Sequence, residues 1–206
     1  MKTLKNKTAL ITGASSGIGE AFAYQLAKQG AHLLITARSA QKLETIAGII
    51  RQQYGVQVWA FAEDLAVAGG ANRLHSAIKN KGLSIDLLVN NAGFGKWTHF
   101  LDESILTYEE MIELNITSLT TLTHLVLPEM LLKTNGGIIN VASTGAFQPC
   151  PYVTTYCATK AYVLSFSEGL YGEYYKKGIT GTALCPGNTV TGFQSIAKAN
   201  TKGMSA

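Results

Sequence analysis

The chain has 206 residues, 47% apolar and 15% charged, a balance that excludes intrinsic disorder and favours a single globular domain. The formal net charge is +4 and the basic residues are spread along the sequence, so no stretch of them indicates a nucleic-acid interface. Three cysteines without a CxxC pair favour a reduced compartment over a disulfide framework, and four histidines without ligand spacing indicate no metal site.

Strand-type and helix-type patterns alternate from one end of the chain to the other. In chain order they are a strand at Thr8–Thr12, a helix at Gly17–Gln29, a strand at His32–Ala37, a helix from Ser39 to about Gln53, a strand at Val56–Ala62, a helix at Val67–Lys81, a strand at Ile85–Val89, a long helix at Thr107–Lys133, a strand at Ile138–Ala142, a helix at Tyr152–Lys176 and a strand at Ile179–Cys185. Strands separated by helices of a dozen residues run parallel, and continuously apolar strands are covered on both faces. The sequence therefore predicts a Rossmann-type, doubly wound α/β fold with about six strands and helices on both faces.

Local signals mark the ends of several of these helices. Ser39 is of the type that caps a helix, and Gly55 is of the type that ends one. Thr107 and Glu110 have the spacing of a capping box, so we expect the long helix to begin there, and we expect Pro128 to bend it.

The ends of the chain and its most apolar stretch bear on localisation. The basic segment Met1–Lys7 lacks the apolar stretch and cleavage site of a signal peptide, and polar residues interrupt the apolar stretch Leu119–Leu132. We therefore expect a cytoplasmic protein that does not cross a membrane. The chain after Phe193 is small and polar with no strand to close the sheet, so we expect residues 193–206 to be the flexible start of a substrate lid at an incomplete C-terminal end.

A glycine-rich turn connects the first predicted strand to the first helix. Gly13 allows a tight exit from the strand, Gly17 lets the backbone approach a pyrophosphate, and Gly19 lets the helix lie close to the sheet. The N-terminus of that helix offers N–H groups and the positive end of its dipole to phosphates. The spacing is Gly-x-x-x-Gly-x-Gly and no Gly-Lys-Ser/Thr follows, so a dinucleotide is favoured over ATP or GTP.

The end of the second strand indicates which dinucleotide is bound. An NAD site usually carries a carboxylate here, whereas this chain has Ala37 followed by Arg38. A guanidinium group can hold a ribose 2′-phosphate through two hydrogen bonds, so the sequence favours NADP(H).

Tyr156 and Lys160 are four residues apart on a predicted helix, so both side chains project from one face. An ammonium group about 4 Å from a phenol contributes about 4 kcal/mol at an effective dielectric constant near 20, which favours the phenolate. The pair alone is not specific, but Ser143 ends the fifth strand and Asn115 lies within the long helix.

Together with Asn90-Asn91-Ala92-Gly93 after the fourth strand and Pro186-Gly187 after the sixth, these motifs resemble the short-chain dehydrogenase/reductase family from Thr8 to Phe193. The resemblance implies an oxidoreductase that moves a hydride between NADP(H) and a carbonyl or alcohol compound. It implies four candidate catalytic residues. Tyr156 would act as the general acid or base, and Lys160 would lower the pKa of Tyr156 and bind the nicotinamide ribose. Ser143 would polarise the substrate oxygen, and Asn115 would anchor a water that relays protons.

The resemblance also implies a cofactor-binding set. Its members are Gly13, Ser15, Ser16, Gly17, Ile18, Gly19, Arg38, Asp64, Leu65, Asn91, Ala92, Gly93, Tyr156, Lys160, Pro186, Gly187, Thr189 and Thr191. Asp64 would meet the adenine amine, Asn91 to Gly93 would line the adenosine, and the two threonines would bond the carboxamide and a phosphate. NADP-preferring relatives often carry a basic residue at the position of Ser16, so NAD(H) stays possible.

Two other functions fit the same fold: a non-catalytic NADP-binding module or redox sensor, and an isomerase that uses its cofactor transiently. The expected walls of the substrate site are Phe94 to Trp97, Gln148 to Tyr152, and Phe193, which favour an apolar small molecule over a sugar. The helices at Thr107–Lys133 and Tyr152–Lys176 resemble the pair through which family members dimerise, so we expect a homodimer or tetramer.

Overall fold

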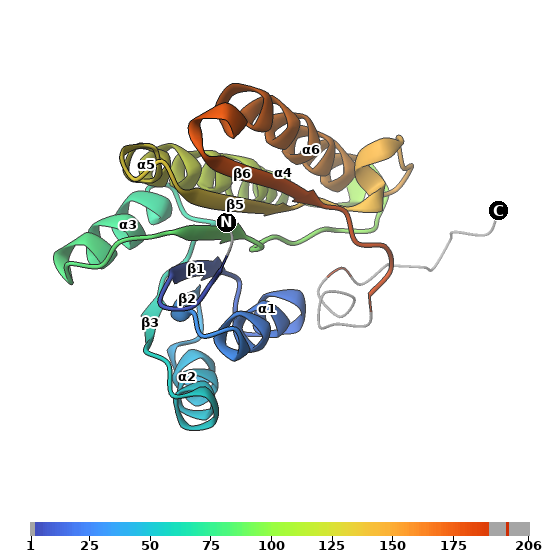
Figure 1. The fold of residues 1–206 in the computed structure, drawn as a ribbon. Helices are drawn as coiled ribbons and strands as arrows, with labels where there is room; N and C mark the ends of the chain where they lie inside the picture. Colours follow the sequence, from blue (N-terminus) through green and yellow to red (C-terminus); the bar gives the residue numbers. More distant parts are fainter. Residues whose placement is uncertain (1–2, 190–196, 198–206) are drawn as a thin grey trace.

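Six parallel strands form the centre of the structure, in the order β3-β2-β1-β4-β5-β6 (Figure 1). In this computed structural model, residues 3–189 and residue 197 are described. The strands are β1 (Thr8–Thr12), β2 (His32–Ala37), β3 (Val58–Ala62), β4 (Leu87–Asn90), β5 (Gly136–Val141) and β6 (Ile179–Leu184). The helices are α1 (Gly17–Lys28), α2 (Ala40–Tyr54), α3 (Gly70–Asn80), α4 (Ile105–Ile112), α5 (Leu119–Leu132) and α6 (Thr154–Tyr174). The predicted doubly wound α/β fold is confirmed.

The strand order reverses between β1 and β4, which are direct neighbours in register from Ala9 beside Leu87 to Ile11 beside Val89. In open parallel sheets, ligands bind outside the carboxyl ends of the strands at this reversal. The fold therefore places the loops after β1 and β4 at the centre of the candidate site.

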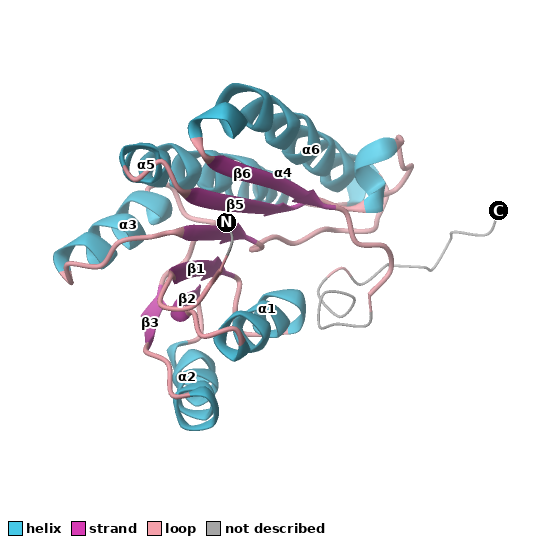
Figure 2. Cartoon of the chain, in the orientation of Figure 1, coloured by secondary structure: helices cyan, strands magenta, loops and turns pink. Residues whose placement is uncertain are grey.

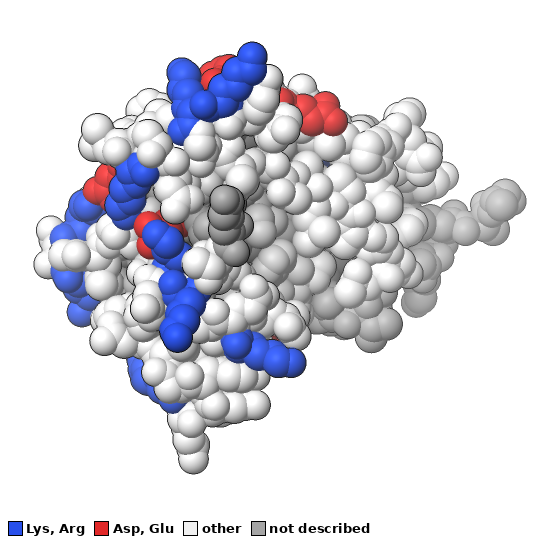
Figure 3. Space-filling model, in the orientation of Figure 1, with Lys and Arg blue, Asp and Glu red and all other residues white. Residues whose placement is uncertain are grey.

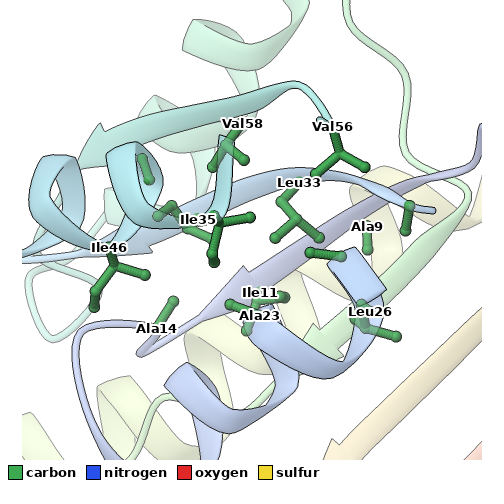
Figure 4. Close-up of a cluster of buried hydrophobic side chains, with 14 of the residues drawn as sticks. Ala9, Ile11, Ala14, Ala23, Leu26, Leu33, Ile35, Ile46, Val56 and Val58 are labelled. Atoms are coloured by element: carbon green, nitrogen blue, oxygen red, sulfur yellow. The ribbon is translucent and has the colours of Figure 1, made fainter. Parts of the chain in front are cut away.

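Helices cover both faces of the sheet, as Figure 2 shows, with α1 and α2 on one face and α3, α5 and α6 on the other. On the first face, Ile11, Leu33 and Ile35 are fully buried against α1 and α2 (Figure 4). The glycine loop and Arg38 are therefore anchored to a rigid core, because strands β1 and β2 lead directly into them.

Several helix ends differ from their prediction. Ser39 and Gly55 cap α2 as expected: the Ser39 side chain accepts from Lys42 N, and Gly55 has a φ of 67°. The capping box at Thr107 is wrong, because Ser104 caps α4 by accepting from Leu106 N, while Thr107 lies inside the helix and donates to Glu103.

The long helix predicted at Thr107–Lys133 is divided into three parts. A π-helical turn, Glu113–Ser118, separates α4 from α5, and Pro128 lies inside α5. The helix predicted from Tyr152 begins two residues later, at Thr154, and Tyr152 itself has a φ of 67°. The strands predicted at Thr8–Thr12 and His32–Ala37 are exact, and the other predicted bounds match or shift by at most three residues.

Basic side chains gather at the edge of the sheet opposite the candidate site. Of the fourteen lysines and arginines among the described residues, nine lie before β1 or at the C-terminal ends of helices: Lys5, Lys7, Lys28, Arg51, Lys79, Lys81, Lys133, Lys176 and Lys177. Cations are favoured at helix C-termini. On the face shown in Figure 3, acidic side chains lie beside several of these basic side chains.

Candidate active site

The glycine loop after β1 has the close contacts that the sequence predicted. Gly13 and Gly17 have φ values of 66° and 59°, a region that favours glycine. A Cβ on Gly19 would lie 2.3 Å from the carbonyl oxygen of Gly13, so no larger residue fits there. Ser16 precedes α1 but its side chain makes no capping hydrogen bond, so it satisfies none of the N–H groups of the first turn.

Two side chains fix this loop against the end of β4. The Thr12 hydroxyl accepts from the backbone N–H groups of Asn91 (3.0 Å) and Ala92 (2.9 Å). In return, the Asn91 side-chain amide donates to the carbonyl oxygens of Thr12 (2.9 Å) and Gly13 (3.3 Å). Asn91 therefore shapes the site by holding the loop. Thr12 is not among the site residues predicted from the sequence, although a hydroxyl residue directly before the first glycine was a usable signal.

The adenosine end of the expected cofactor site lies beside β2 and β3. Arg38 follows β2 directly and is exposed, and the structure gives its guanidinium group no hydrogen bond or ion pair with any residue that it describes. Asp64 follows β3, and its carboxylate accepts from Ala66 N at 2.9 Å. Leu65 is buried and its carbonyl oxygen accepts from the Ser118 hydroxyl at 2.6 Å.

Ser143, Tyr156 and Lys160 lie together at the carboxyl end of β5. Ser143 follows the strand, and its hydroxyl accepts from Gly145 N at 3.1 Å and shares a hydrogen bond with the Tyr156 side chain. Lys160 lies one turn further along α6, with Nζ 5.7 Å from the centre of the Tyr156 ring. Its side chain is 5% exposed, and Nζ donates to the Val141 carbonyl oxygen at 2.7 Å.

The protonation of this cluster differs from the expectation. Burial raises the pKa of Tyr156, and the hydrogen bond from Ser143 opposes this rise in part. Burial lowers the pKa of Lys160 from 10.5 to about 8. The sequence predicted a lowered pKa for Tyr156, whereas the net change in this structure is upward, because that prediction counted the attraction between the two groups and omitted the desolvation of both.

Asn115 is 1% exposed and lies in the π-helical turn between α4 and α5. Its side-chain oxygen accepts from Phe94 N (3.2 Å), and its amide nitrogen donates to Phe94 O (3.0 Å) and to the Thr159 hydroxyl (3.0 Å). A Cβ on Gly93 would lie 2.9 Å from Asn115 Oδ1 and 3.4 Å from Lys160 Nζ, so these residues surround one small space. Thr159 was missed by the sequence analysis, and its position between Tyr156 and Lys160 was the available signal.

The segment after β6 closes one side of the cluster. Thr144 N donates to the carbonyl oxygen of Pro186 (3.0 Å), and the Thr189 hydroxyl donates to that of Gly187 (3.1 Å). Thr191 and Phe193, which the sequence analysis assigned to the cofactor and substrate sites, lie outside the described residues, as does most of the expected lid at 193–206.

The residues directly after the expected substrate wall Phe94–Trp97 contact the expected wall Gln148–Tyr152. Thr98 N donates to the Tyr152 carbonyl oxygen at 2.8 Å, and the rings of His99 and Tyr152 are in edge contact with centroids 4.8 Å apart. Trp97, at the end of one expected wall, is 50% exposed, and Phe147, directly before the other, is 67% exposed.

The residues present fit a dinucleotide. The loop between β1 and α1 requires glycine at Gly13, Gly17 and Gly19, and the Ser16 side chain leaves the N–H groups of the first turn of α1 uncapped, so these groups can bind a pyrophosphate. Arg38 supplies a cation that has no hydrogen bond or ion pair with the residues that the structure describes, at the position expected to meet a 2′-phosphate, and Lys160 supplies a buried ammonium beside Gly93. In the described part of the chain, no group of three or more His, Cys, Asp or Glu side chains could hold a metal ion, and no helix is long and apolar enough to cross a membrane.

Several known proteins are similar to this chain in sequence and in fold. Residues 7–202 match the family model of the short chain dehydrogenases. The chain is 39% identical to the very-long-chain 3-oxoacyl-CoA reductase of Anas platyrhynchos over 92% of its own length, and it spans 62% of the length of that protein.

Among solved structures, a short-chain dehydrogenase from Sphingobium yanoikuyae in complex with NADPH matches with a TM-score of 0.89 and 34% identity, over 97% of this chain and 78% of that one. L-Sorbose reductase from Gluconobacter frateurii, complexed with NADPH and L-sorbose, matches with a TM-score of 0.86 and 33% identity, over 92% and 72% of the two chains. The chain belongs to the short-chain dehydrogenase/reductase family.

Proposed function

We propose that this chain carries an oxidoreductase activity that transfers a hydride between NADP(H) and a carbonyl or alcohol compound. The observation that carries the proposal is the hydrogen-bonded pair of Ser143 and Tyr156, which lies beside the buried Lys160 at the carboxyl end of β5. A protein that only binds a dinucleotide has no use for a phenol and a hydroxyl placed to hold one substrate oxygen. This argument favours an enzyme over the binding-module alternative.

The chain's own residues handle one proton and the position of the substrate. Ser143 donates a hydrogen bond to the substrate oxygen, and Tyr156 gives that oxygen a proton during reduction or removes one during oxidation. NADP(H), when bound, supplies or accepts the hydride. Lys160 holds the nicotinamide ribose and places a positive charge near Tyr156 when its amine is protonated, which favours the phenolate that oxidation requires.

The free guanidinium of Arg38 supports NADP(H) as the preferred cofactor, and the NADPH complexes of the Sphingobium and Gluconobacter proteins agree with it. Ser16 leaves a single basic residue for the 2′-phosphate in this part of the site, so NAD(H) is a second, weaker cofactor.

An apolar carbonyl compound is the substrate class that the exposed rings of Trp97 and Phe147 support. The similarity to a very-long-chain 3-oxoacyl-CoA reductase points the same way, whereas the similarity to L-sorbose reductase points to a sugar. We favour the apolar compound.

The same proposal includes a homodimer and a cytoplasmic location. Exposed apolar side chains on α4 and α6, among them Ile105, Leu106 and Tyr171, support an interface formed by these helices. All three cysteines are free thiols, which supports a reduced compartment.

The test is to incubate the protein with NADPH and three carbonyl compounds: a long-chain 3-oxoacyl thioester, a bulky aromatic ketone and L-sorbose. We expect stoichiometric loss of NADPH absorbance with one of the first two. Turnover of a compound without net loss of NADPH would support the isomerase instead, and binding of NADPH without any turnover would support the binding module.

A further inference from the structure

A buried hydroxyl lies between the two catalytic positions of α6. Thr159 is 1% exposed, and its Oγ1 lies 2.7 Å from the carbonyl oxygen of Tyr156 and 3.0 Å from the side-chain nitrogen of Asn115. The hydroxyl therefore connects α6 to the π-helical turn, across 44 residues of sequence.

The hydrogen-bond partners fix the direction of each bond. A hydroxyl has one proton, and a carbonyl oxygen can only accept, so Thr159 donates its proton to Tyr156 O. Toward Asn115, the Thr159 oxygen can then only accept. Asn115 must therefore turn its NH₂ group toward Thr159, and its carbonyl oxygen must lie on the other side.

The rest of the Asn115 amide agrees with this orientation. Its oxygen accepts from Phe94 N, and the second hydrogen of its nitrogen goes to Phe94 O. A reversed amide would set donor against donor at Phe94 N and acceptor against acceptor at Phe94 O. Because Phe94 follows Gly93, whose Cα faces both Asn115 and Lys160, the orientation of this one amide also shapes the space beside the Lys160 ammonium group.

We propose that Thr159 is a positioning residue for the reaction: its hydroxyl, together with the Phe94 backbone, holds the Asn115 amide in one orientation and thereby fixes the loop after β4 and the π-helical turn against the helix that carries Tyr156 and Lys160. The proposal rests on the proposed function. It does not require Thr159 to touch the substrate or cofactor.

The chain offers a matched control. Thr123, also 1% exposed, donates from its hydroxyl to Leu119 O at 2.8 Å and accepts from the side-chain nitrogen of Asn90 at 3.1 Å. The chemistry is the same buried Thr–Asn pair, but its hydrogen bonds involve neither Asn115 nor Tyr156. If a loss of kcat came only from an unsatisfied buried amide, it should appear when either threonine is replaced.

The first experiment compares Thr159→Val, Thr159→Ser and Thr123→Val in the whole protein. We expect Thr159→Val to lower kcat about 10- to 100-fold, the range that follows from misplacing reacting groups by about 1 Å. Its Kd for NADPH should stay within about threefold of the wild-type value. Thr159→Ser, which keeps the hydroxyl, should restore kcat, and Thr123→Val should lower Tm with wild-type kcat. Wild-type kcat in Thr159→Val, or an equal loss in Thr123→Val, would overturn the proposal.

A double-mutant comparison separates positioning from general damage. In an Asn115→Ala background, Thr159→Val should cause almost no further loss of kcat, because the amide that it orients is absent. Independent, multiplying losses would contradict the proposed coupling.

A second readout needs neither cofactor nor turnover. The side-chain NH₂ of Asn115, assigned by its disappearance in Asn115→Ala, should give NMR signals that exchange slowly with water. We expect Thr159→Val to lower this protection and Thr159→Ser to keep it, whereas protection unchanged in Thr159→Val would refute the proposed role of Thr159 in holding the amide. If the wild-type protein reduces no carbonyl compound, the proposed function fails, and this measurement still decides the role of Thr159.

Discussion

Replacing Lys160 with methionine tests how strongly burial acts on the ammonium group at the centre of the site. The pKa of Lys160 is lowered from 10.5 to about 8 by burial, a change of about 2.5 pKa units, which corresponds to about 3 kcal/mol at about 1.4 kcal/mol per unit. The folded protein thus binds this proton more weakly than the unfolded chain does. Below pH 8, both states are protonated and the folded wild type carries the whole penalty.

The sign of the pH dependence follows from that difference. Between pH 8 and 10.5 the folded state loses the proton while the unfolded chain keeps it, so the penalty fades as pH rises. Relative to Lys160→Met, the wild type should gain up to about 3 kcal/mol of unfolding free energy between pH 7 and 10.5. Lys160→Met also removes the hydrogen bond from Nζ to Val141 O, which changes the unfolding free energy by an amount that does not depend on the pKa of Lys160. The quantity to compare is therefore how the difference in unfolding free energy changes with pH.

The assay is urea unfolding of the cofactor-free proteins at a series of pH values from 7 to 10.5. Lys42→Met, which removes an exposed lysine from the first turn of α2, is the control for losing a surface charge. A difference in unfolding free energy between wild type and Lys160→Met that is constant across this range, or that changes in the opposite direction, would show that burial does not lower the pKa of Lys160.

Three further predictions follow from the site. Tyr156→Phe should lower turnover by roughly two to four orders of magnitude, the usual contribution of a positioned acid or base, while NADPH binding measured by calorimetry stays nearly unchanged; wild-type turnover would exclude Tyr156 as the proton donor. Arg38→Asp should reverse a preference for NADPH over NADH in titrations of both cofactors, because a carboxylate repels the 2′-phosphate and accepts from a ribose hydroxyl; equal wild-type affinities would remove the role of Arg38. Sedimentation at micromolar concentration should show a homodimer, and a monomer would contradict the proposed interface.

Local chemistry was enough to predict the elements that define the fold. Helix caps and tight turns depend on the residue's own backbone or on its immediate neighbours, so the residue type alone predicts them. Examples are the caps Ser39 and Gly55 and the glycines after β1. Thr107 failed as a cap because Ser104, three residues earlier, has the same chemistry and lies at the actual start of α4. Sequence alone offers no means to choose between two such hydroxyl residues.

Features that depend on distant contacts were not predictable. The π-helical turn has no local signal, and it places Asn115 against Phe94 and Thr159, which lie far from it in the sequence. Spacing also showed that Tyr156 and Lys160 share a helix face but not how deeply each is buried, and desolvation reversed the expected change in the pKa of Tyr156.

Transfer of an isotope from the cofactor shows directly whether this chain moves a hydride from NADPH to a carbonyl compound. The measurement uses NADPH that carries deuterium at both hydrogen positions of the reactive carbon of its nicotinamide ring, together with the carbonyl compound that is turned over best. We expect one deuterium on the carbon of the alcohol formed, with the label absent when Tyr156→Phe replaces the wild type over the same time. An alcohol without deuterium, or bound NADPH that is never consumed with any carbonyl compound, would contradict this expectation.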